Sequence, residues 1–260
     1  MSGSTISQTP AVNPTSAARD KVILVTVVLL LWQGLAQFAG PEVLTTPPAT
    51  VQKLWYLMSD SQFSGHAHQT GSAFLFALMI SWIGGLIFGV LLGAHRLSGE
   101  VMEPMLVGLY SIPKITLYPV VLLLFGLGMS AKVAFGAIHG IIPVMLFTMN
   151  AVRNIPRRYI KAGQSMRLSP IQMFTGILVP ASLPEIITGF RLGFSLTLLG
   201  TLIGEMFASQ RGIGYMLVKS MENNDADVIV ALALLLVVLA TTASWLLLTL
   251  ERRVHARFKP

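Results

Sequence analysis

The sequence predicts an all-α protein that crosses a membrane several times, with six transmembrane helices. Hydrophobic residues make up 53% of the 260 residues and charged residues 11%, whereas soluble domains carry about 25% charged residues. The mean hydropathy is +0.70, and long apolar stretches alternate with shorter polar ones. The chain contains no cysteine, which excludes disulfides, thiolate nucleophiles and cysteine-based metal sites.

Six stretches approach the roughly 20 mostly apolar residues that a membrane-spanning helix needs. Prolines and Lys114 interrupt the third, and Pro143 and several glycines lie in the fourth. Neighbouring helices or a watery cavity satisfy the backbone of such interrupted helices, so we expect these two inside the bundle. In the second, Gly85 and Gly89 have the spacing that permits close helix contact. The six stretches are Val22 to Phe38, Gly71 to Ala94, Val101 to Leu127, Lys132 to Val152, Ile186 to Ala208 and Val228 to Leu250.

The two ends of the chain are polar. Residues 1–21 are rich in Ser, Thr and Pro and are predicted to form a disordered tail, and residues 251–260 form a basic tail. The first apolar run ends in AQFAG, which leaves a cleaved signal peptide open, but its length favours an uncleaved first span. Residues 22–250 are therefore the predicted membrane domain.

The basic residues predict the orientation of the spans. With the N-terminus inside, twelve lie in inner segments and four in outer ones, a bias typical of a cytosolic N-terminus and C-terminus. This distribution explains the net charge of +7 without a nucleic-acid partner. The inner residues are Arg19, Lys21, Arg96, Arg153, Arg157, Arg158, Lys161, Arg167, Arg252, Arg253, Arg257 and Lys259, and the outer ones are Lys53, Lys132, Arg211 and Lys219.

The segment PEVLTTPPATVQKLWYLMSD lies between the first two spans. Val51, Leu54, Trp55 and Met58 repeat in it at helical spacing, which predicts an amphipathic helix at the outer membrane interface. An ordinary packed connection is the alternative.

The longest predicted cytosolic loop spans residues 153–184 and includes RYIKAGQSMRLSPIQMFTGILVPASLP. Pro156 begins one helix of about three turns. Ser169 and Pro170 form a helix-start signal, a Ser N-cap followed by Pro at the first position, for a second piece reaching Leu178. Pro180 and Pro184 are expected to end this piece and begin the fifth span. Two helices joined at a sharp corner predict a rigid protrusion.

Three motifs resemble those of one family. VPASLPEIITGFRLGFSLTLLGTLIGEMF, SIPKITLYPVVLLLFGLG and GEMFASQRGIGYML are similar to the loop, third span and post-span-five motifs of ABC importer permeases of the nitrate, sulfonate and taurine branch. The resemblance runs from about Leu44 onward. It implies a type I-like permease fold, a coupling helix, and a bacterial inner-membrane location. It also implies a second copy of the chain, two cytosolic ATP-binding subunits and an extracytoplasmic solute-binding protein.

The resemblance places the coupling helix at Ala162 to Ser169, where it would insert into a cleft of the ATPase. Where the family loop opens with Glu-Ala-Ala, this chain has Lys161, Ala162 and Gly163, and Arg167 replaces a family glycine. A non-glycine residue fits there if the backbone stays helical or another residue takes the corner. The alternative is a basic loop held by anionic lipid head groups. The predicted coupling residues are Lys161, Ala162, Gly163, Met166, Arg167, Ser169 and Pro170.

The predicted translocation pathway contains Pro113, Lys114 and Glu205. An ionisable residue within a span is costly unless it faces a cavity or a partner, so Lys114 is a functional candidate, with snorkelling or structural pairing as its alternatives. Glu205, near the outer end of the fifth span, is its candidate partner or part of an outer gate.

Other classes of protein lack support in the sequence. No G-x-x-x-x-G-K-[ST] loop is present, so ATP and Mg²⁺ are expected on the partner ATPase. An ion-coupled carrier, the alternative function, would show internal repeats with paired acids near mid-membrane. A membrane enzyme would need a cluster of catalytic groups, and isolated His139 and Lys114 form none. The positive charge of Lys114 and the outer segments favours an anionic substrate such as a sulfonate or nitrate.

Overall fold

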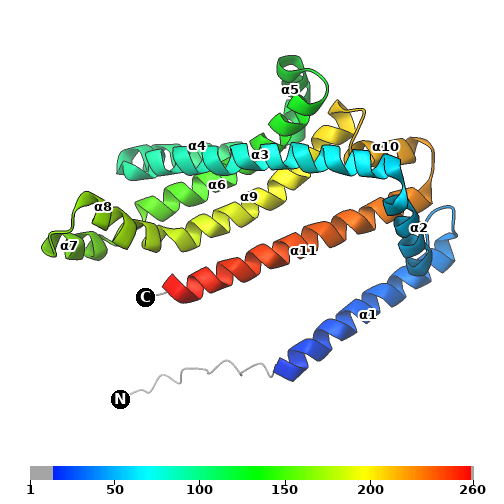
Figure 1. The fold of residues 1–260 in the computed structure, drawn as a ribbon, viewed down its shortest axis with the longest axis horizontal. Coiled ribbons are helices and arrows are strands. Elements are labelled where there is room, and N and C mark those ends of the chain that lie inside the picture. The colour runs from blue at the N-terminus through cyan, green and yellow to red at the C-terminus, as the bar shows by residue number, and fades with distance from the viewer. Residues whose placement is uncertain (1–13, 259–260) are drawn as a thin grey trace.

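The computed structural model describes residues 14–258, and this part of the chain consists of helices and their connections (Figure 1). Five helices are long and apolar enough to cross a membrane, and a bent pair is a candidate sixth, in agreement with the predicted fold class. In chain order the elements are α1 (Pro14–Ala39), α2 (Pro47–Ser59), α3 (Ser61–Ala94), α4 (Arg96–Ser111), η1 (Lys114–Leu117), α5 (Tyr118–Phe125), α6 (Met129–Arg153), α7 (Arg157–Ser165), α8 (Pro170–Met173), η2 (Phe174–Leu178), α9 (Val179–Ala208), α10 (Ile213–Glu222) and α11 (Ala226–Phe258).

The helices run between two ends of the molecule, the α7 end and the α10 end (Figure 1). The loop of α7 and α8 lies at the α7 end, and the last turns of α11 point toward it. The α10 end contains α10, the C-terminus of α9 and the first turns of α3 and α6. The last described helix, α11, therefore finishes on the side of the molecule that carries the long loop.

The centre of the bundle is α3, α6 and α9, and small residues bring these helices into contact. A Cβ atom on Gly85 of α3 would lie 2.6 Å from the Val144 side chain of α6, and one on Gly89 would lie 2.6 Å from Thr148. One turn earlier on α6, where α3 and α9 both approach, a Cβ atom on Gly140 would overlap the hydroxyls of Ser81 and Thr197. The close contact predicted for Gly85 and Gly89 is confirmed.

The predicted third span is not one helix. α4 and the segment Lys114–Phe125 are bent by 86° relative to each other. Ile112, immediately before Pro113, is extended with φ −67° and ψ 132°, as expected from the clash of a proline ring with the preceding residue in helical conformation. Leu123 is 86% exposed, so the expectation of an interior position is wrong for this segment within the chain. It is correct for α6, the most buried of the candidate spans.

α2 is helical, as its apolar spacing predicts. Val51, Trp55 and Met58 are exposed, whereas Leu57 packs against a buried cluster that contains Phe63 and Val228. Its position at a membrane interface stays a prediction. The preceding turn is fixed because the Trp32 indole of α1 donates to the Thr45 carbonyl at 3.0 Å.

Helix boundaries differ from expectation in the loop and at the chain ends. Pro180 and Pro184 do not end a helix, because the chain continues as one helical rod from Pro170 to Phe207. Its π-helical turn, Phe174–Leu178, precedes Pro180, which lies in the first turn of α9, while Pro184 is inside that helix. Of the predicted N-terminal tail, residues 1–13 lie outside the described residues and 14–21 belong to α1. Residues 251–258 of the predicted basic tail continue α11.

We expect Gly85→Leu to destabilise the bundle by about 1–3 kcal/mol, since a larger side chain overpacks the contact of α3 with α6. The matched control is Gly71→Leu on the same helix, because nothing lies within 4 Å of a Cβ atom there. Thermal unfolding in detergent measures both variants. Equal melting temperatures for the two would contradict the proposed role of the small residues.

Candidate functional site

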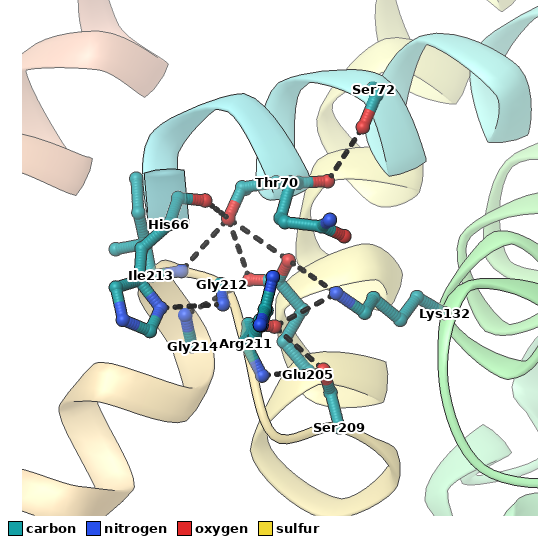
Figure 2. A network of polar contacts seen from close by, with 11 residues as sticks. His66, Thr70, Ser72, Lys132, Glu205, Ser209, Arg211, Gly212, Ile213 and Gly214 are labelled. Carbon is teal, nitrogen blue, oxygen red and sulfur yellow. Dashed lines mark hydrogen bonds and ion pairs between the residues drawn. The ribbon is translucent and has the colours of Figure 1, made fainter. Parts of the chain in front are cut away.

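Glu205 of α9 is a buried carboxylate that contacts residues of α3, α6 and α10 at the α10 end (Figure 2). Its side chain on α9 is 0% exposed. The Thr70 hydroxyl of α3 lies 2.9 and 2.8 Å from its two oxygens, and the Gly214 backbone N–H of α10 donates to it at 3.0 Å. The Lys132 ammonium of α6 is 3.6 Å away. We call Glu205, Lys132, Thr70, His66 and residues 209–214 the Glu205 cluster.

Thr70 connects the carboxylate to the start of α10. Its hydroxyl donates to Glu205 and accepts the Ile213 backbone N–H at 2.8 Å. The first N–H groups of a helix have no partner inside the helix. Thr70 and Glu205 satisfy two of them, those of Ile213 and Gly214, and so fix where α10 begins.

The loop 209–214 is fitted closely over Glu205. Gly212 has φ +124°, a conformation that side chains disfavour, and a Cβ atom there would overlap the Glu205 carboxylate. Its N–H donates to His66 Nδ1 at 2.9 Å, and the His66 ring stacks on Tyr215 with 6.0 Å between ring centroids. A glycine is therefore required at this position both by its backbone angle and by the carboxylate beneath it.

Lys132, and not Lys114, is the cation beside Glu205. Its side chain is 2% exposed, and its ammonium donates to the Arg211 carbonyl at 2.8 Å. Lys114 instead donates to the Tyr110 carbonyl at 3.0 Å and lies 4.9 Å from the centre of the Tyr110 ring. The suggested pairing of Lys114 with Glu205 is wrong, because Lys114 and Pro113 stand at the 86° bend, where their contacts are local.

At the α7 end, the predicted coupling residues form a corner between α7 and α8. α7 ends at Ser165, earlier than expected. Leu168 N–H then donates to the Gly163 carbonyl at 3.1 Å and Arg167 N–H to the Gln164 carbonyl at 3.0 Å, the two bonds of a Schellman motif. Arg167 has φ +50°. Neither expected alternative holds, since Arg167 itself takes the left-handed corner conformation for which glycine is favoured.

The second half of the corner begins as the sequence predicts. The Ser169 side chain accepts the Gln172 N–H while the Gln172 side chain accepts the Ser169 N–H, a complete capping box, and Pro170 occupies the first turn. Gly163 is buried, and a Cβ atom on it would lie 2.6 Å from Met173 of α8. The corner is thus locked by backbone motifs and by one close contact.

The other predicted coupling residues are on the surface of this corner. Met166 is 71% exposed, and exposed positions are also held by Lys161, Ala162, Arg167, Ser169 and Pro170. Gly163 is the exception, since it packs inward. The structure therefore brings the predicted coupling residues together, whereas it separates Lys114 and Pro113 from Glu205.

Several residues of the Glu205 cluster were not identified from the sequence. The sequence places Lys132 only among the outer basic residues and gives no signal for His66. The one available signal was the motif GEMFASQRGIGYML, which places Glu205, Gly212 and Gly214 close together in the chain. The contributions of Thr70 and Lys132 come from distant helices. Another pairing between distant helices joins Arg191 of α9 to Glu251 of α11 at 2.6 Å.

Comparison with known proteins gives consistent results. The family model "binding-protein-dependent transport system inner membrane component" matches residues 85–256. A probable ABC transporter permease protein of Haemophilus influenzae is 26% identical, covering 83% of this chain and 88% of that protein. The putative aliphatic sulfonates transport permease protein SsuC of Escherichia coli is 28% identical and covers 86% of each. The taurine transport system permease protein TauC of the same organism is 24% identical and covers 88% and 86%.

A solved structure has the same fold. An inward-facing structure of the MetNI methionine ABC transporter aligns with a TM-score of 0.63 and 20% identity, covering 74% of this chain and 95% of that chain. The chain belongs to the family of inner membrane components of binding-protein-dependent transport systems. It is a multi-pass permease subunit of an ABC importer and not an enzyme, since ATP hydrolysis belongs to a separate subunit. The predicted nitrate, sulfonate and taurine branch is confirmed.

We expect Lys132→Met to destabilise the chain by about 3 kcal/mol or more, because it leaves the buried Glu205 carboxylate without its cation. The double variant Lys132→Met/Glu205→Gln should recover much of this loss, since a neutral amide needs no cation. Lys219→Met is the control, because its pair with Glu222 is exposed and such pairs contribute about 1 kcal/mol or less. Thermal unfolding measures all three, and equal losses in the single and double variants would contradict the pairing.

We expect Arg167→Gly to slow amide exchange at the corner, because it relieves a left-handed conformation that costs a side-chain-bearing residue about 1 kcal/mol. Gln164→Gly, in the last turn of α7, should have the opposite effect because glycine weakens a helix. Hydrogen exchange followed by mass spectrometry of peptides covering residues 157–173 compares them. Faster exchange in Arg167→Gly would contradict the conformational explanation.

Proposed function

We propose that two copies of this chain form the membrane pathway of an importer driven by two cytosolic ATP-binding subunits. An extracytoplasmic solute-binding protein delivers a small solute, and alternating access passes it to the cytosol. The observation that carries the proposal is the α7–α8 corner, where six of the seven predicted coupling residues are exposed on a rigid protrusion. This corner, within the loop 153–184, is the surface that engages the ATPase.

The α7 end is proposed to face the cytosol. The last turns of α11 lie on that side (Figure 1). It also collects basic residues, among them Arg157, Arg158, Arg252 and Arg253, which are exposed, and basic residues favour the cytosolic side. The same residues would contact anionic lipid head groups. The α10 end and the Glu205 cluster then face outward.

The exposed bend at Ile112 and Pro113 supports the proposal that a second copy of the chain packs against it. Irregular backbone at membrane depth is tolerated only where protein covers it or where it lines a watery cavity. Apolar side chains around the bend, including Leu109, Ile112 and Ile115, are exposed in the single chain. We assign this surface to the partner copy and the pathway between the copies, which keeps Pro113 and Lys114 as pathway residues.

The proposed substrate is a small organic or inorganic anion. The relatives include SsuC, TauC and the nitrate import permease NrtB of Leptolyngbya laminosa, whose names describe sulfonate, taurine and nitrate transport. At the proposed outer end, Arg211 adds positive charge, whereas Lys132 and Lys219 are paired with Glu205 and Glu222. An ion-coupled carrier is not favoured, because the family is one of binding-protein-dependent transport.

We expect Ala162→Glu to reduce transport by more than about tenfold and to reduce the amount of co-purified ATPase, because a charged side chain enters the docking surface of a coupling element. Ala256→Glu is the matched control, since Ala256 is an exposed alanine at the same end of the molecule but on α11. Gly163 is unsuitable for this test, because its substitution would disturb the contact with Met173.

Transport is measured in vesicles that contain the complete system, and co-purification is measured after solubilisation. Full transport and full ATPase recovery in Ala162→Glu would contradict the assignment of the corner. A similar loss in Ala256→Glu would show that any added negative charge at this end is responsible, which would also contradict it.

A further inference from the structure

A cavity of about 560 Å³ lies beside the Glu205 cluster at the α10 end. Its polar wall contains Gln69 of α3, Lys132 of α6, and Ser209, Gln210 and Arg211 of the loop after α9. Its apolar wall includes Leu127 and Phe207. Cations and amides on one side and apolar side chains on the other are the lining expected for a small ligand that has a charged head and a short apolar part.

Two cationic side chains, Arg211 and Lys132, line this cavity, and the Glu205 carboxylate lies beside Lys132. The Arg211 side chain is exposed and makes no hydrogen bond or ion pair with another residue in the part of the chain that the structure describes. Lys132 and Glu205 together are neutral, so Arg211 leaves the region with an excess positive charge. An anion is the ligand charge that this excess favours.

The Lys132 ammonium has bonding capacity left for a ligand. Of its three donors, one bonds the Arg211 carbonyl at 2.8 Å and one is directed to Glu205 at a longer 3.6 Å (Figure 2). The carboxylate does not depend on the ammonium alone, since Thr70 and Gly214 also donate to it. One donor of a buried ammonium therefore remains for the cavity that Lys132 lines.

The first turn of α6 adds positive electrostatic potential to the same cavity. Gly128 and Met129 line the cavity, and Gly128 is the N-cap of a 25-residue helix with no side-chain cap. The N-terminus of a helix carries partial positive charge from its aligned peptide dipoles. It reinforces the two basic side chains without forming a site by itself.

We propose that this cavity is an anion-binding site that takes nitrate or the sulfonate group of a small alkylsulfonate at the outer mouth of the permease. Arg211 and Lys132 bind the oxygens, Gln69 and Gln210 complete the polar wall, and Leu127 and Phe207 contact the alkyl part. The inference rests on the importer function proposed above and adds to it a place where the anion first meets the membrane subunit.

The test uses the full chain, purified with its transport partners in lipid nanodiscs, and methanesulfonate as the probe. Saturation-transfer NMR of the methyl protons measures binding, and nitrate is added as a competitor. We expect a saturable signal that nitrate reduces and that tetramethylammonium, a cation of similar size, does not give. Arg211→Gln should weaken binding by about tenfold, the loss expected for a charge-assisted hydrogen bond.

Lys219→Gln is the matched control, because it removes a cation of α10, at the same end of the molecule, that does not line the cavity. Its binding curve should equal that of the unsubstituted protein. Absence of a signal, an equal signal from tetramethylammonium, or equal weakening by Lys219→Gln and Arg211→Gln would overturn the site.

A transport assay with the cognate binding protein separates this inference from the proposed function. Anion transport without methanesulfonate binding at the cavity would overturn the site and leave the importer function intact. Binding that Arg211→Gln weakens, in a system that transports only a cation, would support the site and contradict the proposed substrate. If the complete system transported no solute when ATP is supplied, the proposed importer function itself would be contradicted.

Discussion

The close approach of α3, α6 and α9 is the constraint on which the rest of the structure depends. Between helices in lipid, the hydrophobic effect gives little driving force, so packing and interhelical hydrogen bonds hold a bundle together. Here glycines admit the neighbouring helix, and polar side chains bond across the contact. Ser81 and Thr197 hydroxyls lie 3.2 Å apart, and the Trp82 indole donates to the Phe190 carbonyl at 3.2 Å.

The same close packing creates the Glu205 cluster. A Cβ atom on Gly204 would lie 3.0 Å from the Lys132 Cα atom, so α6 and α9 are in backbone contact immediately beside the ion pair. Burying two charges costs several kcal/mol per ion unless additional hydrogen bonds compensate. Thr70, Gly214 and the Arg211 carbonyl provide those bonds. The pair consequently requires one arrangement of the loop 209–214, and its contribution lies more in fixing that arrangement than in net stability.

Features of the fold that depend on local sequence could be predicted, and features that depend on helix register could not. Apolar stretches gave the spans, and Ser169 with Pro170 gave the start of α8, because hydrophobic length and capping are local properties. The partner of Glu205 is set by how α6 and α9 are aligned, so Lys114 and Lys132 could not be distinguished from their positions in the chain. The positive φ of Arg167 was missed because the residue carries a side chain and only the Schellman bonds around it define the turn.

The two candidate sites lie at opposite ends of one helical rod. Helical structure continues without a break from Pro170, at the corner, to Phe207, beyond Glu205. The π-helical turn Phe174–Leu178 and Pro184 are departures from regular α-helix along the way, and both lie near the corner. A helix transmits displacement along its axis because shortening it would break its hydrogen bonds. If an ATPase moves the corner, the regular part of α9 carries that movement to Glu205, and the ties to Thr70, Lys132 and Gly214 determine which neighbouring elements follow it.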